Sequence, residues 1–547
     1  MSKNVILKDK TGVQLFPATT AEQVYYDGQI DIKQALGHFV TPEMYGAVSD
    51  GVTDDSTAFQ AAVNSGKNVY LGSGSYAIKN ISISQDVVIY GNAATINALE
   101  QTANSNQFAN VFTASNADVK LQGIIFNGLG EALTTTTDRF ISLIKVNGGN
   151  AHINHCKFYN FDTLNQMISS DLGINRRGSI FTSVNCESVK IIDSTFEEIS
   201  GDEFIWIISS TQSGRNEITG CKFDTISSNS INILHGDVRI ENNVFYDWNS
   251  STSIFNFNGT NLIASNNRFY NCVSSDVFDC YEVGYMRMNN VVITNNILYG
   301  CADLRFANLC ADSILISGNQ VSCGTFVRVA NLMAVQSVFP FDNSTAKQIE
   351  SVIITDNYID LFETNTTGNI ASGMQIMYRE GISETLPDNT QVLKNLLIVN
   401  NTIHCNPSLV KAELAGGYKS GFVFAFGNKI DSIRIKNNTI INMPKALNIS
   451  SGSTMMCYIQ NYYDKSIGYF EFDDLVIDRD ESASNTIFYF MYFRNETGYS
   501  PTVPAVAAVK YGGIYFTENA VFSDPRRWGG SDASHTTVNE YSDPYAS

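Results

Sequence analysis

The segment Ile240-Glu241-Asn242-Asn243-Val244-Phe245 decides the fold, because its pattern of an apolar residue, a polar turn and a large apolar residue returns along the chain. Other copies are Ile293-Thr294-Asn295-Asn296-Ile297-Leu298, Ile354-Thr355-Asp356-Asn357-Tyr358-Ile359 and Ile435-Lys436-Asn437-Asn438-Thr439-Ile440. The last apolar residue of each copy serves as a marker, and the markers are Phe158, Phe196, Phe223, Phe245, Phe269, Leu298, Val321, Ile359, Ile403 and Ile440. Successive markers lie 22 to 44 residues apart, and the shorter steps are 22 to 29 residues. A constant core with loops of variable length is typical of a solenoid.

A second column of residues lies two positions before each marker. It reads Cys156, Ser194, Cys221, Asn243, Asn267, Asn296, Asn319, Asn357, Asn401 and Asn438. Asn tolerates the left-handed backbone of a tight bend, and its amide can hydrogen-bond to an identical amide one coil away. Alternation such as Val238 and Ile240 against Arg239 and Glu241 predicts strands. We therefore predict an all-β chain, a right-handed parallel β-helix whose coils stack about 4.8 Å apart. A β-sandwich would not explain the Asn column.

Composition and charge exclude several classes of function. The 547 residues have a net charge of −19, which disfavours binding to nucleic acid phosphates and to anionic membranes. No apolar run reaches the length of a membrane span, and the N-terminus lacks the apolar core of a secretory signal. The ten Cys contain no C-x-x-C pair, and the six His have no metal-ligand spacing. We expect buried free thiols, no metal, no cofactor, no membrane insertion and no secretory signal.

The repeat also divides the chain into domains. Residues 1–41 are non-repetitive and predict an N-terminal module, which ends at Pro42. Residues 42–445 should form the β-helix, with a capping helix at about 56–65 that starts after an acidic N-cap and hides the open end of the first coil. The pattern blurs over 446–547, where we expect a β-rich region that forms further coils or joins chains into a trimer.

The stretch from Tyr45 to Ile78 resembles the opening of the pectate-lyase-like β-helix superfamily, which reads G-A-x-x-D-G-x-T-D-D, a helix and V-Y-L-P-x-G-x-Y. The matching residues are Gly46, Ala47, Asp50, Gly51, Thr53, Asp54, Asp55, Ala58, Phe59, Val69, Tyr70, Leu71, Gly74 and Tyr76. Gly72 stands where that phrase usually has a proline. The phrase is structural in the superfamily, so it indicates the fold and not the chemistry. The first forty residues look like the N-terminal module of tail-fibre and tailspike proteins of phages.

Together the two resemblances imply a phage tail component. Such a tailspike or receptor-binding protein would be part of the virion, attach through its N-terminus to a phage tail or baseplate protein, and form a homotrimer. Its partner would be a host-surface glycan, which it would recognise and cleave as a polysaccharide depolymerase, either a glycoside hydrolase or a lyase. Two alternatives stay open: a non-catalytic receptor-binding or structural tail protein, and a free-standing bacterial polysaccharide lyase or hydrolase. The missing secretory signal weighs against the second alternative.

Glycan cleavage needs paired carboxylates on one exposed face, and aromatic rings bind the apolar faces of sugars. Counting seven and ten residues past each marker finds an outward stripe that carries both. The candidates are Asp276, Asp279 and Glu203 as catalytic acids, and Trp206, Arg305 and Arg328 as substrate-binding residues. Adjacent coils would let Asp276 pair with Arg305, whereas three coils, about 14 Å, separate Glu203 from Asp276, too far for a hydrolytic pair. The alternative for each residue is a solvated surface charge.

Overall fold

The structure, a computed structural model, describes the following parts of the chain: residues 25–26, 30–31, 38–99, 110–128, 142–162, 179–201, 204–209, 214–250, 252–280, 288–301, 305–332, 349–361, 374–379, 392–405, 420–426, 429–443, 453–461, 467–473, 475–479, 487–495, 509–511, 514–516 and 524–530. The chain forms two compact units, Met1–Glu197 and Glu198–Ser547, which we call the N-terminal and C-terminal units. Most of the module predicted at 1–41 lies outside the described residues. Within it, β1 (Tyr25–Tyr26) and β2 (Ile30–Asp31) pair antiparallel.

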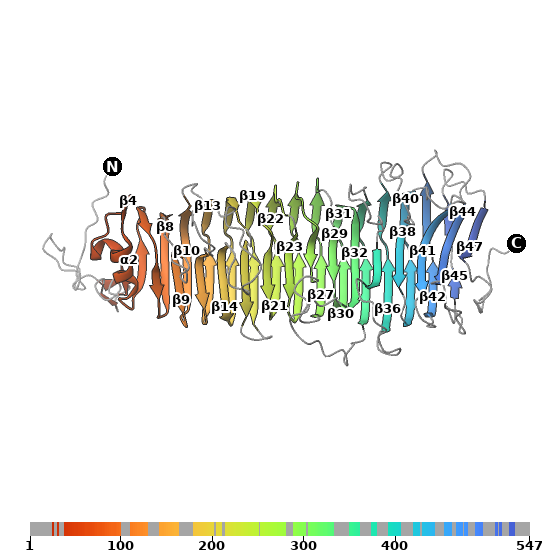
Figure 1. The fold of residues 1–547 in the computed structure, drawn as a ribbon, viewed down its shortest axis with the longest axis horizontal. Coiled ribbons are helices and arrows are strands. Elements are labelled where there is room, and N and C mark those ends of the chain that lie inside the picture. The colour runs from red at the N-terminus through yellow and green to blue at the C-terminus, as the bar shows by residue number, and fades with distance from the viewer. Residues whose placement is uncertain are drawn as a thin grey trace. The chain divides into compact units, whose positions relative to one another are not determined.

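The N-terminal unit is built of parallel strands that wind into coils (Figure 1). Its elements are β3 (Phe39–Val40), the short 3-10 helix η2 (Pro42–Tyr45), β4 (Asp50–Asp54), α2 (Ser56–Val63), β5 (Asn68–Leu71), β6 (Ser75–Ile78), β7 (Ile81–Ile83), β8 (Val87–Ala98), β9 (Phe112–Ser115), β10 (Val119–Asn127), β11 (Ser142–Asn147), β12 (Asn150–Asn154), β13 (Lys157–Asp162), β14 (Ser179–Cys186) and β15 (Ser188–Ile192). The long strand β10 pairs with both β12 and β13, so it runs through two faces of one coil. Strand β16 (Thr195–Ser200) spans the boundary between the units.

The C-terminal unit repeats one coil of three strands, which form three parallel sheets. The first sheet contains β18 (Arg215–Thr219), β21 (Asp237–Glu241), β24 (Asn261–Ser265), β27 (Met288–Thr294), β30 (Ala311–Ser317), β33 (Ile349–Thr355), β36 (Val392–Val399), β39 (Lys429–Lys436), β42 (Ile467–Asp473) and β45 (Val509–Tyr511). The second contains β19 (Lys222–Ser227), β22 (Val244–Tyr246), β25 (Arg268–Tyr270), β28 (Ile297–Tyr299), β31 (Gln320–Cys323), β34 (Tyr358–Leu361), β37 (Thr402–Cys405), β40 (Thr439–Met443), β43 (Leu475–Arg479) and β46 (Ile514–Phe516). The third contains β17 (Ile205–Ser209), β20 (Ile231–Leu234), β23 (Ser253–Asn258), β26 (Asp276–Asp279), β29 (Arg305–Leu309), β32 (Thr325–Leu332), β35 (Met374–Arg379), β38 (Ser420–Phe426), β41 (Ser453–Asn461), β44 (Ile487–Asn495) and β47 (Asp524–Gly530).

The predicted fold class, a right-handed parallel β-helix, is confirmed. Neighbouring strands within these three sheets pair parallel in the described chain. Examples are β21 with β24 and β22 with β25. Parallel pairing continues beyond residue 445, because β41, β44 and β47 extend the third sheet in register. The blurred repeat near the C-terminus therefore still contains coils of the same kind.

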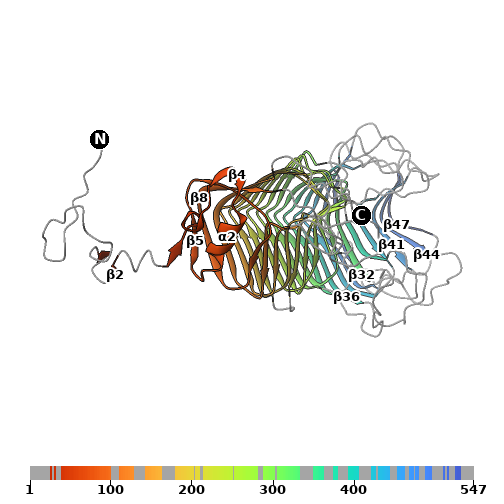
Figure 2. The ribbon, with the colours of Figure 1, turned by 60° about the vertical axis from the view of Figure 1, so that its left-hand side comes forward.

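Helix α2 has the place expected for a cap. Its apolar face is buried, and Phe59 packs against Tyr76 and Phe112, with ring centroids 6.0 and 5.8 Å away. Figure 2 shows α2 lying across β4, β5 and β8 at one end of the N-terminal unit. This placement covers the edge of the first coil, which would otherwise be free to pair with another chain.

The Asp-Gly-Val-Thr-Asp-Asp motif that precedes α2 has a structural role. Asp50 accepts hydrogen bonds from the backbone N–H groups of Val52 and Thr53 at 2.9 and 2.7 Å. Asp55 stands at the N-cap position but does not cap the helix with its side chain. Its buried carboxylate instead accepts from the backbone N–H groups of Val48 and Ser49, at 2.7 and 3.1 Å. These bonds fix the turn into the helix, so the phrase needs no catalytic explanation.

The Asn column of the C-terminal unit forms a continuous buried ladder between the first and second sheets. Each amide Nδ2 donates to the Oδ1 of the next Asn at 2.9 to 3.0 Å, and each backbone N–H donates to the same oxygen at 2.9 to 3.1 Å. The members are Asn243, Asn267, Asn296, Asn319, Asn357, Asn401 and Asn438. The predicted ladder is thus confirmed. The left-handed residue of the bend is the preceding one, for example Asn242 at φ 59°, so the ladder residue itself is free to point inward.

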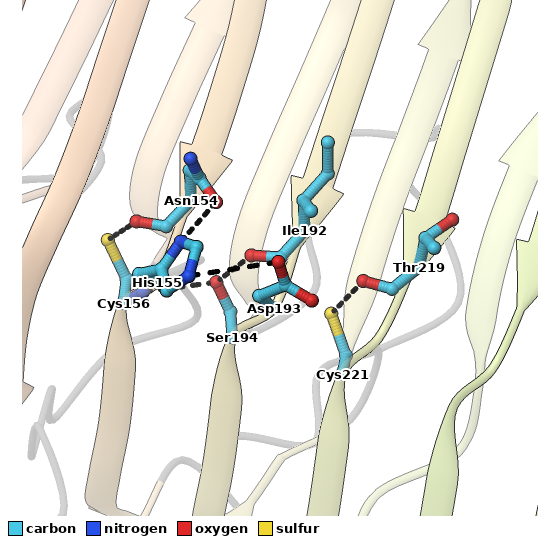
Figure 3. A network of polar contacts seen from close by, with 8 residues as sticks. All are labelled: Asn154, His155, Cys156, Ile192, Asp193, Ser194, Thr219 and Cys221. Carbon is cyan, nitrogen blue, oxygen red and sulfur yellow. Dashed lines mark hydrogen bonds and ion pairs between the residues drawn. The ribbon is translucent and has the colours of Figure 1, made fainter.

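Earlier coils place smaller side chains at the same turn (Figure 3). In the N-terminal unit, the backbone N–H of Cys156 donates to Ser194 Oγ at 3.1 Å, and Ser194 Oγ donates to the carbonyl of Ile192 at 2.8 Å. In the C-terminal unit, the backbone N–H of Cys221 donates to Oδ1 of Asn243 at 2.9 Å, which joins Cys221 to the start of the ladder. Burial raises the pKa of the Cys156 thiol to about 11, so this thiol stays neutral.

The marker residues form the core, as predicted. In the C-terminal unit the rings of Phe223, Phe245 and Phe269 stack with centroids 4.6 Å apart and are fully buried. In the N-terminal unit Phe126 and Phe158 stack at 4.7 Å. Eight Cys of the described chain are buried and free, as expected for small apolar side chains.

Candidate functional site

A row of polar side chains follows the outer face of the third sheet. Backbone register aligns Trp206, Asn232, Asn256, Asp279 and Asn308 in consecutive coils, and we call these five residues the outer row. The backbone of Arg328 continues the row in β32. The row faces away from the core, because the side chains on either side of it in sequence, such as Phe255 and Phe257 around Asn256, pack together inside the coil.

Hydrogen bonds link the members of the outer row along the sheet. Asn256 Nδ2 donates to Oδ1 of Asn232 and to Oγ of Ser230, both at 3.0 Å. Asp279 accepts at one oxygen from Asn308 Nδ2 at 3.1 Å and at the other from Ser253 Oγ at 2.9 Å. Trp206 is partly exposed, whereas the other four members are at most 4% exposed. The row is therefore an ordered polar track with an aromatic ring at one end.

An ion pair lies on the same strands, three residues before the outer row. Asp276 of β26 and Arg305 of β29 are in register, and Arg305 Nε lies 2.7 Å from Asp276 Oδ1. Arg305 Nη2 donates to the second oxygen, Oδ2, at 3.0 Å. Asp276 is 1% exposed, while about a third of the Arg305 side chain reaches solvent. The guanidinium of Arg305 thus contacts both oxygens of the Asp276 carboxyl.

The structure brings some of the predicted site residues together and separates others. The expected pair of Asp276 and Arg305 is present, and Asp279 shares strand β26 with Asp276. The count of seven residues past each marker placed Arg328 in one column with Asp276 and Arg305, and this register is wrong, because Thr325 is in register with Arg305 and Arg328 with Asn308. The glutamate at position 203 lies outside the described residues.

The stripe was also expected to be exposed, and for the two aspartates this is wrong. Asp276 and Asp279 are 1% and 2% exposed. The alternation of apolar and polar residues predicts which face of the sheet a residue lies on. It does not predict how deeply the residue is buried, because burial depends on the side chains and loops that pack over that face. Burial also raises the pKa of the neighbouring thiol of Cys280, and the carboxylate of Asp279 adds to this rise.

Sequence reasoning missed Asn232 and Asn256. Each stands between two large apolar residues, in Ile231-Asn232-Ile233 and Phe255-Asn256-Phe257, and that pattern marks a polar side chain on the outer face of a buried strand. A fixed count from the markers selected Ile233 and Phe255 instead, which both point into the core.

A second surface carries exposed aromatic rings on the second sheet. Tyr246, Tyr270 and Tyr299 are in register, and Tyr246 and Tyr270 stack at 5.1 Å. The Nζ of Lys222 lies 5.7 Å from the Tyr246 ring, so both faces of that ring are occupied by neighbours. Tyr299 is 69% exposed. This row presents few free ring faces to a sugar, which makes it the weaker candidate.

Two further structural findings bear on function. Within the described ranges, no group of three or more His, Cys, Asp or Glu side chains has an arrangement that could hold a metal ion. In the same ranges, no helix combines the length and the apolar character that crossing a membrane requires.

Comparison with known proteins gives one curated match. An alignment of 179 positions is 30% identical to the pre-neck appendage protein of Bacillus phage B103, and it covers 28% of this chain and 20% of that protein. The sequence resemblance to phage tail proteins is thus matched by a phage appendage protein. No protein-family model matches the chain.

Solved structures with similar coils have low sequence identity. Tailspike protein 3 of bacteriophage CBA120 is 15% identical, covers 96% of this chain and 67% of its own, and has a TM-score of 0.34. The tailspike of E. coli bacteriophage HK620 is 10% identical, with coverages of 89% and 82% and a TM-score of 0.34. The A-module of the Azotobacter vinelandii mannuronan C-5 epimerase AlgE6 is 14% identical, with coverages of 87% and 99% and a TM-score of 0.31. At these scores the likenesses carry no argument about function.

Proposed function

We propose that this protein is a phage tail component that recognises a polysaccharide on the host surface. The observation that carries the proposal is the outer row, an ordered polar track along the third sheet with Trp206 at one end. Amides and carboxylates hydrogen-bond to hydroxyl groups, and an aromatic ring packs against the apolar face of a sugar. The coils repeat about every 4.8 Å along the row, which suits a repeating ligand, and Trp206 is the partly exposed member of the row.

The assignment to a phage particle has separate support. It rests on the likeness to the phage B103 appendage protein and on the resemblance of residues 1–41 to the attachment modules of tail fibres and tailspikes. The matched region covers only a fifth of the appendage protein, so its role does not transfer as a whole. A bacterial polysaccharide lyase or hydrolase is the alternative with the same fold.

Cleavage of the glycan is a second candidate activity, because the outer face carries two carboxylates on one strand. Asp276 and Asp279 are the candidate catalytic acids, with Glu203 as a third and with Arg305 and Arg328 as substrate-binding residues. Hydrolysis requires one group that donates a proton. Asp276 pairs with the Arg305 guanidinium, and Asp279 accepts hydrogen bonds from Ser253 Oγ and Asn308 Nδ2, so the contacts at both carboxyls suit a binding role better than proton donation. This favours recognition over cleavage.

Binding and cleavage are separated by one experiment on the full-length chain. Labelled protein is incubated with host cells and with purified capsule, and adhesion, new reducing ends and ultraviolet absorbance of unsaturated products are measured. Adhesion without products supports a receptor-binding protein. Products that vanish in Asp276→Asn or Asp279→Asn support a depolymerase. A protein that neither adheres nor cleaves contradicts the proposal.

A matched pair of variants locates the glycan-binding surface. Trp206→Ala should weaken adhesion by about fivefold or more, since an aromatic contact is worth about 1 kcal/mol or more. Tyr299→Ala removes an exposed ring from the second sheet and should leave adhesion unchanged. If Tyr299→Ala alone weakens adhesion, the glycan binds the tyrosine row and the site proposed on the third sheet is wrong.

Assembly into the phage particle is also a proposal. We expect a homotrimer that docks through residues 1–41, as the resemblance to tailspikes implies. Light scattering should give three times the single-chain mass of 60.2 kDa. A chain that lacks residues 1–40 should remain trimeric but fail to enter virus particles. A mass near that of one chain would contradict the trimer.

A further inference from the structure

The outer face of the first sheet carries an uninterrupted row of aliphatic side chains. Backbone register aligns five outward positions in consecutive coils, from β24 to β36 (Figure 1), and we call these residues the aliphatic row. The members are Ile263, Val292, Leu315, Ile353 and Leu397. They lie outside the coil, because the residues on either side in sequence, such as Ile314 and Ile316 around Leu315, are buried. All five are half-buried, so their outer sides reach solvent.

Two rows of small side chains border the aliphatic row on the same strands. Two residues before it lie Asn261, Asn290, Ser313, Ser351 and Asn395. Two residues after it lie Ser265, Thr294, Ser317, Thr355 and Val399. None of these residues is charged, and we call the three rows together the uncharged face.

Charged side chains reappear in the coils on both sides of the uncharged face. Strands β21 and β39, which pair with its first and last strands, carry the following outward charged residues: Asp237, Arg239, Glu241, Arg434 and Lys436. Along one edge of the face, Lys394 Nζ lies 2.6 Å from the Glu350 carboxylate. A centre depleted of charge within a charged and polar rim is the composition typical of a protein–protein interface.

The chemistry of this face decides what kind of partner it takes. Aliphatic side chains offer a glycan neither hydrogen bonds nor an aromatic ring, so the face suits a protein. The charges favour a second copy of this chain. With a net charge of −19, copies repel one another, and this repulsion is least where the surfaces that meet carry no charge.

Symmetry adds a second reason. Around a rotation axis that runs along the stacked coils, each residue near the axis approaches the same residue of the other copies. A charged residue there would therefore meet its own charge. The uncharged face avoids this over five coils, about 24 Å at the usual strand separation.

We infer that the aliphatic row lies along the rotation axis of the assembled protein and packs against the same row in other copies of this chain. This inference rests on the proposed homotrimer and names the face through which the chains join. An axis parallel to the stacked coils places all N-termini at one end, as the proposed attachment to a phage particle requires. The outer row lies on the third sheet, which forms another face of the coil.

The test compares the full-length variants Ile353→Asp and Ile297→Asp. Ile297 is also half-buried and outward, but it lies on the second sheet. Folding is followed by circular dichroism and mass by light scattering. Ile353→Asp should have the single-chain mass of 60.2 kDa at concentrations where the wild type and Ile297→Asp have three times that mass. Its association should be weaker by about hundredfold or more, because like charges meet at the axis.

A second pair of variants decides the question if an aspartate at position 353 impairs folding. Ile353→Cys keeps a small apolar side chain at the axis, and a short bismaleimide should cross-link it between chains. Ile297→Cys should stay uncross-linked under the same conditions. The wild type measures the background from the native thiols, eight of which are buried.

The outcomes separate the inference from the proposed homotrimer. Loss of the trimer in Ile353→Asp alone, with cross-linking of Ile353→Cys alone, supports the inference. A trimeric Ile353→Asp, equal losses in the two aspartate variants, or a trimeric Ile353→Cys that does not cross-link would each overturn it and leave the homotrimer standing. If the wild type has the mass of one chain, the inference and the homotrimer are both wrong. If such a single chain needs Ile353 to enter virus particles, the aliphatic row binds another virion protein instead.

Discussion

Replacement of Phe245 by Ala tests how the stacked core stabilises the coils. The ring is fully buried, and it lies between Phe223 and Phe269 with centroids 4.6 Å away on both sides. Trp248 and Phe255 close the remaining sides at 5.9 and 5.4 Å. A Phe→Ala change in a core costs about 3–5 kcal/mol, and each aromatic pair adds about 0.5–1.5 kcal/mol beyond its buried area.

The cost should lie at the upper end of that range. The cavity cannot collapse, because hydrogen bonds to β19 and β25 fix strand β22 on both sides. We therefore expect Phe245→Ala to lose about 4–5 kcal/mol of unfolding free energy. The assay is the urea midpoint of the full-length chain compared with that of Arg239→Ala. Arg239 is an outward residue on β21 whose side chain is 59% exposed and lies 4.0 Å from Glu241.

Arg239→Ala should lower stability by less than about 1 kcal/mol, as for other exposed ion pairs. Equal losses in the two variants would refute the reasoning, because a register slip of one residue exchanges the inner and outer faces of a strand. A solenoid can unfold in stages, so both variants are compared by the transition that reports on the C-terminal unit.

Three further predictions concern other parts of the molecule. Asn296→Ala should lower stability by about 2–5 kcal/mol, because it strips both the backbone and the amide N–H of Asn267 of a buried acceptor, and a urea midpoint equal to that of the wild type would contradict this. Asp276→Asn should cost about 1–3 kcal/mol through loss of the buried contact with the Arg305 guanidinium, and an unchanged midpoint would mean that the pair contributes nothing. Hydrogen bonds from the backbone N–H groups of Thr53 and Val52 lower the pKa of Asp50 from its ordinary 3.8. The stability that Asp50 contributes is therefore present above pH 3.8 and is lost as the pH falls below it. In thermal melts between about pH 2.5 and 6, the decrease in melting temperature at low pH should be smaller for Asp50→Asn than for the wild type.

The first and second sheets could be predicted from the sequence because one turn of constant length joins them. Each ladder Asn lies two residues before its marker in every copy, so a single alignment sets the register of both sheets. The steric demand of the left-handed residue and the hydrogen bonds of the ladder keep this turn constant. An insertion there would break the ladder.

The third sheet could not be aligned by counting, and the reason is the second turn of the coil. The residues in register there are Ile231, Phe255, Phe278, Ala307 and Val327. They lie 8, 10, 9, 9 and 6 residues after their markers Phe223, Phe245, Phe269, Leu298 and Val321. A turn that varies this much shifts every outward position, which is why Arg328 was paired with the wrong column. The pattern of one polar residue between two large apolar ones would have found the register.

The inner ladder and the outer row differ in how completely their amides satisfy one another. An amide has donors and an acceptor, so a row of amides can satisfy itself, and the inner ladder from Asn243 to Asn438 does so out of reach of solvent. Asp279 breaks the outer row, because it supplies acceptors only. The row therefore lacks a donor for Oδ1 of Asn256, which has no hydrogen-bond partner within the described chain and lowers its stability.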